Sequence, residues 1–127
     1  MGILKKVLDR VSGKVPKGAK RSPRWQTVRS LHLLAESRCA VCGGNDKLEV
    51  HHIVPFNVDP SMELYSSNLI TLCESKRGGV NCHLFFGHLG NYSCYNISIK
   101  SDAVKWNEKI SLRIKSTAAM FSDGQKI

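Results

Sequence analysis

The fold is decided by one stretch of the sequence, which begins at Cys39-Ala40-Val41-Cys42 and continues through Val50-His51-His52-Ile53, Asn68-Leu69-Ile70-Thr71-Leu72-Cys73 and Asn81-Cys82-His83 to His88. It contains four cysteines in two groups, with histidines between and after them. A segment this short buries too little apolar surface to be stable alone, so a metal ion is expected to hold it together. The cysteines and the histidines are therefore predicted to form two separate metal sites.

Length, charge and composition limit the classes to which the protein can belong. Its 127 residues predict one domain with additional segments at its ends. The formal charge of +9 favours a polyanionic partner, with nucleic acid ahead of an anionic membrane surface. No apolar run approaches the roughly 20 residues of a membrane span, and the N-terminus lacks the pattern of a signal peptide. A cytoplasmic location is expected, in which paired cysteines bind metal more often than they form disulfides.

The cysteine spacing predicts a structural zinc site. Two cysteines separated by two residues, as Cys39 and Cys42 are, both reach one ion, and structural zinc takes four ligands in a tetrahedron. Cys73 and Cys82 are the expected partners, because the long insertion between them adds only a slowly growing entropic cost. A disulfide or buried free thiols are the alternatives. The fifth cysteine, Cys94, is expected to be a buried or half-buried residue outside the site, or else to replace Cys82 as the fourth ligand.

Hydrophobic patterns predict an α+β fold with a small ββα-metal core. Residues 48–56 and 69–72 are expected to form two strands, and residues 83–89 a short helix. The expected flanking elements are a helix from Ser22-Pro23, with Trp25 and Leu31 in the core, and a helix capped by Ser101-Asp102 that frays from Ser116. The chain then divides into a basic N-terminal arm (1–24), a central domain (25–97) and a C-terminal helix and tail (98–127).

The histidines predict chemistry on a phosphodiester. His51 and His52 are adjacent in an expected strand and so point to opposite faces, one toward a metal ion and one toward substrate. A near-neutral histidine is a suitable general base for water, and one divalent cation stabilises the phosphate and the leaving oxygen. His83 is favoured as a further ligand because it follows Cys82. His88 is the alternate, since on a regular α-helix it lies about 140° from His83.

Basic residues near the N-terminus suggest contacts with phosphates. The arm is either a solvated tail or a segment that lies along nucleic acid, and the C-terminal helix carries further lysines. The candidate nucleic-acid-binding residues are Lys14, Lys17, Lys20, Arg21, Arg24 and Arg77.

The order of these motifs over residues 38–96 resembles that of the HNH endonucleases, in the variety whose ββα-metal core is held by cysteine pairs. The resemblance implies enzymes that cut or nick DNA with one Mg²⁺, Mn²⁺ or similar ion and leave a 5′-phosphate and a 3′-hydroxyl. The long spacing between the third and fourth cysteines departs from the family pattern. The implied roles are first metal ligand for His51, general base for His52, middle asparagine for Asn68, and final metal ligand for His83 or, alternatively, His88.

The sequence thus predicts a metal-dependent HNH endonuclease that acts on DNA, with structural zinc and a second, catalytic divalent ion. Family analogy adds a phage origin and work beside packaging or recombination proteins in the bacterial cytoplasm. The alternative is a non-catalytic zinc-containing module that binds nucleic acid. That alternative explains the charge and the cysteines, but it does not explain the order His-His, Asn, Cys-His. A membrane-surface protein is a weaker third interpretation.

Overall fold

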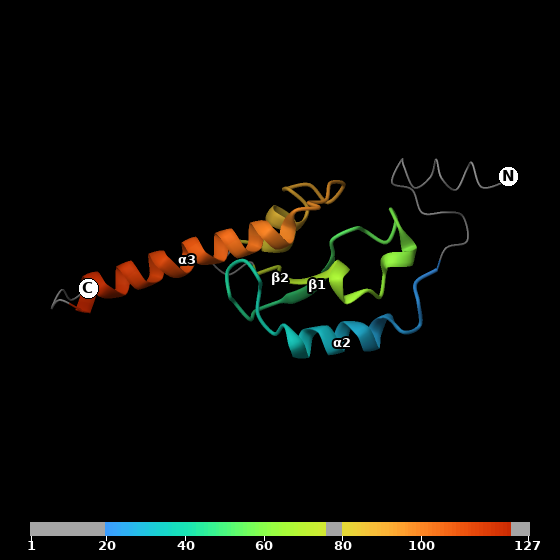
Figure 1. Ribbon diagram of the computed structural model, residues 1–127, viewed down its shortest axis with the longest axis horizontal. Helices are drawn as coiled ribbons and strands as arrows, with labels where there is room; N and C mark the ends of the chain where they lie inside the picture. The colour runs from blue at the N-terminus through green and yellow to red at the C-terminus, as the bar shows by residue number, and fades with distance from the viewer. Residues whose placement is uncertain (1–19, 76–79, 123–127) are drawn as a thin grey trace.

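The computed structural model describes residues 20–75 and 80–122, with two strands at its centre and a helix on either side (Figure 1). Two 3₁₀ turns lie between the strands, and one π-helix follows the second strand. In chain order the elements are α2 (Trp25–Ala35), β1 (Leu48–His52), η1 (Pro60–Met62), η2 (Ser66–Asn68), β2 (Leu69–Cys73), η3 (His83–Gly87) and α3 (Ile99–Ser122).

The two strands form an antiparallel hairpin on which both candidate sites depend. Leu48 pairs with Cys73 and His52 pairs with Leu69, so the register runs through the whole of both strands. Every residue of β2 is buried, as its uninterrupted apolar sequence favours. The order strand, loop, strand, short helix confirms the predicted α+β fold with a ββα core.

The first strand is shorter than expected and ends at His52 instead of Phe56. The cause is Asn68, whose side chain replaces the strand ladder at this point. Its Oδ1 accepts the N–H of Val54 at 2.8 Å, and its Nδ2 donates to the carbonyls of Val54 and Met62 at 3.1 Å each. These bonds close the connection between the strands into a loop with fixed ends.

Helix α2 makes less contact with the core than its apolar pattern predicts. The expectation for Leu31 was wrong, since its side chain is 61% exposed, and no residue of α2 is fully buried. The helix contacts the sheet at a few points instead. Trp25 lies against the His52 ring, and Arg29 Nη2 donates to Glu49 Oε2 at 3.3 Å. A narrow contact of this kind leaves the opposite face of α2 in solvent.

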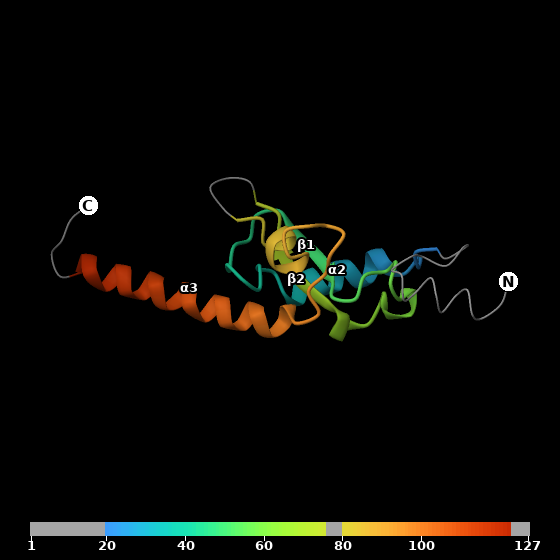
Figure 2. The same ribbon diagram turned by 90° about the horizontal axis from the view of Figure 1, so that it is seen from above.

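Helix α3 begins two residues earlier than expected and ends later. Asn96 organises its start, since its Oδ1 accepts the N–H of Ser98 and its Nδ2 donates to Asp102. The helix continues past Ser116, where fraying was expected, to Ser122. Figures 1 and 2 show that it runs away from the sheet. Its N-terminal half packs on the core, through the buried residues Ile99 and Ala103, the partly buried Ile110 and a hydrogen bond from Asn107 Nδ2 to the Val41 carbonyl.

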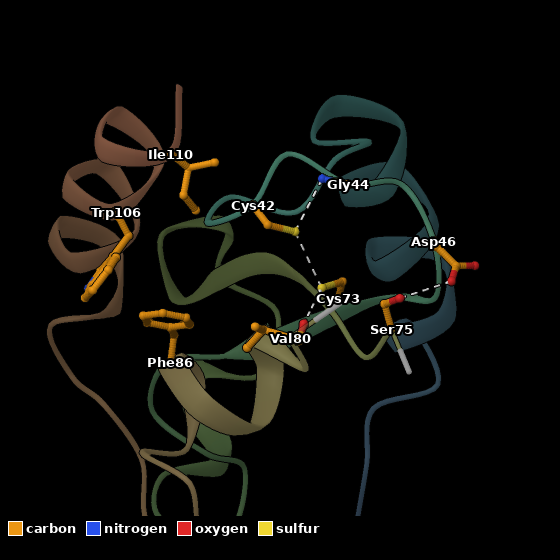
Figure 3. A pocket seen from close by; sticks show the side chains of 9 residues that line it. All are labelled: Cys42, Gly44, Asp46, Cys73, Ser75, Val80, Phe86, Trp106 and Ile110. Carbon is orange, nitrogen blue, oxygen red and sulfur yellow. Dashed lines mark hydrogen bonds between the residues drawn. The ribbon is translucent and has the colours of Figure 1, made fainter. Parts of the chain in front are cut away.

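An apolar pocket of about 400 Å³ lies between α3 and the cysteine segment. Figure 3 shows Phe86, Trp106 and Ile110 on one side of this pocket and Cys42 and Cys73 on the other. Among the described residues, no helix is both long enough and apolar enough to cross a membrane.

Candidate metal centres and catalytic site

Four cysteines from three separate segments converge on one point. Their sulfur atoms all lie within 4.8 Å of one another. They come from the loop before β1 (Cys39 and Cys42), the end of β2 (Cys73) and the residue before η3 (Cys82). The Cys42 and Cys73 sulfurs are 3.7 Å apart. Zn–S bonds of about 2.3 Å in a tetrahedron require sulfurs about 3.8 Å apart, so the group fits a zinc ion.

The backbone of the first cysteine pair is shaped for metal binding. Gly43 has φ of +76°, a conformation that glycine adopts without strain, and the Gly44 N–H points to the Cys42 sulfur at 3.4 Å. The hydrogen bond from Cys82 lowers the pKa of the Cys39 thiol, and the same contact raises the pKa of the Cys82 thiol. A thiolate is the form that binds metal. The Cys94 thiol is exposed and lies outside this group.

Three histidines form a second convergent group. The ligand nitrogens of His51, His83 and His88 lie within 4.8 Å of one another, and the Nε2 atoms of His83 and His88 are 3.2 Å apart. His51 is only 2% exposed, and its buried Nε2 has no hydrogen-bond partner among the residues that the structure describes. Burial, followed by the neighbouring imidazoles, lowers the pKa of His51 to about 3. A buried, neutral and unpartnered imidazole nitrogen has the chemistry of a metal ligand.

The π-helix explains why His83 and His88 both reach this group. The expectation that they point apart assumed α-helical geometry. In η3 the N–H of His88 instead bonds to the carbonyl of His83, five residues earlier, at 3.1 Å. Residues five apart therefore lie one turn above each other on the same face. Gly87 allows η3 to pack closely, because a Cβ there would lie 3.1 Å from Cε1 of His51.

Two further groups orient the second and third imidazoles. His83 Nδ1 lies 2.8 Å from the Glu74 carboxylate, and His88 Nδ1 lies 2.7 Å from the backbone carbonyl of Cys94. Both partners are acceptors, so each Nδ1 carries the proton and each Nε2 keeps a free lone pair. Such partners are typical of metal-binding histidines. Sequence reasoning missed both. The position of Glu74, directly after Cys73, could have indicated its role. The backbone carbonyl of Cys94 could not, because any residue supplies a carbonyl.

His52 faces the side of the hairpin opposite to His51. Its ring packs against Trp25 with the ring centroids 4.4 Å apart, and its Nε2 lies 2.9 Å from the carbonyl oxygen of Glu63. A carbonyl only accepts, so Nε2 donates its proton and Nδ1 holds the lone pair. Burial is the main cause that lowers the pKa of His52, and the charge of Arg21 adds to it. The imidazole is therefore neutral at physiological pH.

Asn68 is placed to hold structure. It is 2% exposed, and its side chain bonds to the backbone of Val54 and Met62. This fixes the loop that carries Glu63 and hence the carbonyl that orients His52.

The basic residues expected to contact nucleic acid lie in different environments. Lys20 and Arg24 are exposed. Arg21 is 3.4 Å from the buried carboxylate of Glu63, which is a specific contact and not that of a free arm. The remaining three, Lys14, Lys17 and Arg77, lie outside the described residues.

Comparison with known families identifies the central segment. Residues 39–84 match the family model described as HNH endonuclease. These residues form an HNH domain. The match covers less than half of the chain. No curated protein and no solved structure matches the chain. The HNH domain contains all four clustered cysteines, both histidines of β1, Asn68 and His83, whereas His88, α2 and α3 lie outside the matched residues.

Proposed function

We propose that the protein is a metal-dependent endonuclease that hydrolyses phosphodiester bonds of DNA. One observation carries the proposal: three imidazoles converge on one side of the hairpin, and a neutral imidazole with a free lone pair, His52, lies on the adjacent residue. A purely structural metal site would need the converging imidazoles but not the neighbouring base. Phosphodiester hydrolysis needs both a cation site and a base for water.

His52 serves as the general base in this proposal. The bond from its Nε2–H to the Glu63 carbonyl fixes the tautomer, so Nδ1 accepts the proton of the attacking water. The lowered pKa keeps Nδ1 unprotonated at neutral pH. The Trp25 ring restricts rotation of the imidazole, and Asn68 holds the loop that supplies the carbonyl.

The two metal sites differ in the ions that suit them. Zinc fits the four cysteines in charge, softness and spacing. His51, His83 and His88 would hold the catalytic divalent ion, which when bound stabilises charge on the phosphate and on the leaving 3′ oxygen. Three imidazole donors favour Mn²⁺, Co²⁺, Ni²⁺ or Zn²⁺ over Mg²⁺, which prefers oxygen ligands. We therefore favour a transition-metal ion among the divalent ions considered from the sequence.

The net charge and the basic helix α3 support a DNA substrate. The formal charge of +9 favours a phosphate-rich partner, and α3 extends from the core with five lysines and arginines against two acidic residues. We retain as proposals the bacterial cytoplasm as the location, the division at residues 24 and 97, and phage packaging or recombination proteins as partners.

A plasmid-nicking assay tests the proposed function. The zinc-loaded protein is freed of other divalent ions and then given Mg²⁺, Mn²⁺, Co²⁺ or Ni²⁺ in turn. Wild type should convert supercoiled plasmid to the nicked or linear form, and His52→Ala should lose cleavage by about 10²- to 10⁴-fold while it retains zinc. Tight DNA binding without cleavage under every ion would favour the non-catalytic alternative. Equal rates for wild type and His52→Ala would exclude His52 as the base.

A further inference from the structure

Arg21 occupies a structured position next to His52. Its guanidinium carbon lies 4.6 Å from the ring centroid of Phe56 and 5.6 Å from that of Trp25. Its Nε lies 3.4 Å from Oε2 of Glu63, a carboxylate that is 5% exposed. Two aromatic rings and a buried anion therefore fix this side chain. Fixing a long side chain in advance reduces the conformational entropy lost when it binds a ligand.

The outer end of the Arg21 guanidinium is available for a ligand. The side chain is 48% exposed, and the ion pair with Glu63 uses Nε. Within residues 20–75 and 80–122, no hydrogen bond involves the two terminal nitrogens. Glu63 Oε2 itself has no hydrogen bond of good geometry, so the contact is one of charge. A guanidinium that presents two terminal NH₂ groups to solvent matches two oxygens of a phosphate.

Two residues connect Arg21 to the base. Glu63 accepts the Nε2–H of His52 through its backbone carbonyl, and it holds Arg21 and the N–H of Ser22 through its carboxylate. Trp25 packs against the His52 ring and lies below the Arg21 guanidinium. Arg21 and His52 thus belong to one constellation, although 30 residues of the sequence lie between them.

We propose that Arg21 binds the scissile phosphate of DNA and stabilises the charge that develops there, with Glu63 and Trp25 as its positioning residues. This inference rests on the proposed function, because it takes His52 as the base that acts on the same phosphate. It assigns Arg21 a specific place in the active site, beyond the general attraction of a basic arm for phosphates. The matched family segment, residues 39–84, includes neither Arg21 nor Trp25.

Cleavage kinetics of the zinc-loaded full chain test the inference, with Lys47→Ala as the control. Lys47 is exposed in the turn before β1, so its removal takes away one positive charge without disturbing the constellation. We expect Arg21→Ala to lower the rate at saturating DNA on the order of 10- to 100-fold, the effect of one charged hydrogen-bonded pair made in the transition state. Arg21→Lys should recover only part of that rate, because it lacks the two-pronged geometry. Lys47→Ala should lower the rate at saturating DNA no more than about twofold.

A second variant separates substrate binding from folding. Arg21→Ala leaves the buried Glu63 carboxylate unpaired, whereas Arg21→Ala with Glu63→Gln removes that charge and retains an acceptor for the Ser22 N–H. We expect the double variant to melt close to wild type and still to lose cleavage. If Arg21→Ala and Lys47→Ala behave alike, or if the double variant regains wild-type rates, the inference fails and the proposed function stands. A wild type that cuts under no ion rejects both.

Discussion

Gly87→Ala is the sharpest structural perturbation of the histidine site. A Cβ at this position would lie 3.0 Å from Cδ1 of Leu72, 3.1 Å from Cε1 of His51 and 3.2 Å from its Nε2. Leu72 and His51 are both buried, so neither has free space into which to move. The added methyl group must therefore displace η3 or the His51 imidazole by a few tenths of an ångström.

The expected magnitude follows from two opposing effects. Overpacking of a filled core costs about 1–3 kcal/mol. Replacing glycine by alanine in a helix returns at most about 1 kcal/mol. The net loss of folding free energy is then on the order of 1 kcal/mol. The effect on metal affinity should be larger, about 10- to 100-fold, comparable to the loss of a group that orients a metal ligand.

Calorimetry separates the two effects with a matched glycine. Gly90 has φ of +83°, and no atom of the described residues lies within 4 Å of its Cβ position, so Gly90→Ala costs backbone strain of about 1–2 kcal/mol without a contact to His51. Both variants should unfold at lower temperature than wild type. Only Gly87→Ala should bind Co²⁺ more weakly when titrated into the zinc-loaded protein. Wild-type affinity in Gly87→Ala would refute the packing of η3 on the ligand imidazole.

Three other predictions concern the same scaffold. Cys39→Ser should unfold or aggregate and lose its zinc, as elemental analysis and circular dichroism will show, because in so small a core metal binding supplies folding free energy; retained zinc and stability would contradict the four-cysteine site. The His51 imidazole resists protonation in the fold, with a pKa of about 3 against an ordinary 6.5, so the unfolded state takes up a proton first and stability should fall below pH 6.5 by up to about 1.4 kcal/mol per pH unit. Urea unfolding between pH 7.5 and 5.5 should show this slope in wild type and a flatter one in His51→Asn, and equal slopes would show that His51 titrates normally. Glu74→Gln should weaken Co²⁺ binding about 10-fold or more with zinc content unchanged, and an unaltered affinity would show that Glu74 does not orient its imidazole.

Local rules of the chain are enough to predict much of the fold and part of the site. Two residues between Cys39 and Cys42 bring their sulfurs to one point, and the period of two in a strand places His51 and His52 on opposite faces. The uninterrupted apolar run before Cys73 predicts the buried strand. Each of these inferences depends only on residues that are close together in the sequence. Distant contacts therefore do not alter it, and the structure agrees with it.

The parts that depend on backbone geometry or on distant partners could not be predicted from the sequence. The π-helix that brings His83 and His88 together shows no signal in the side-chain pattern. The acceptors for the imidazoles include two backbone carbonyls, of Glu63 and Cys94, which any residue could supply. The start of α3 was misplaced because the side chain of Asn96, which bonds to Ser98 and Asp102, organises it, whereas a cap by Ser101 and Asp102 themselves was expected. Leu31 was expected in the core because its helix is apolar on one face, but α2 contacts the sheet at a few other points and leaves Leu31 61% exposed.

The central claim is that one divalent ion at His51, His83 and His88 drives DNA cleavage. The most direct measurement follows bound ion and nicking rate in the same titration of zinc-loaded protein with Co²⁺. We expect the rate to rise in proportion to occupancy and to saturate at one added ion per chain, and we expect His88→Ala to shift both curves together toward higher ion concentration. Cleavage that is already complete with one zinc per chain held by the four cysteines and the histidine site empty, or that continues to rise after the histidine site is full, would contradict the claim.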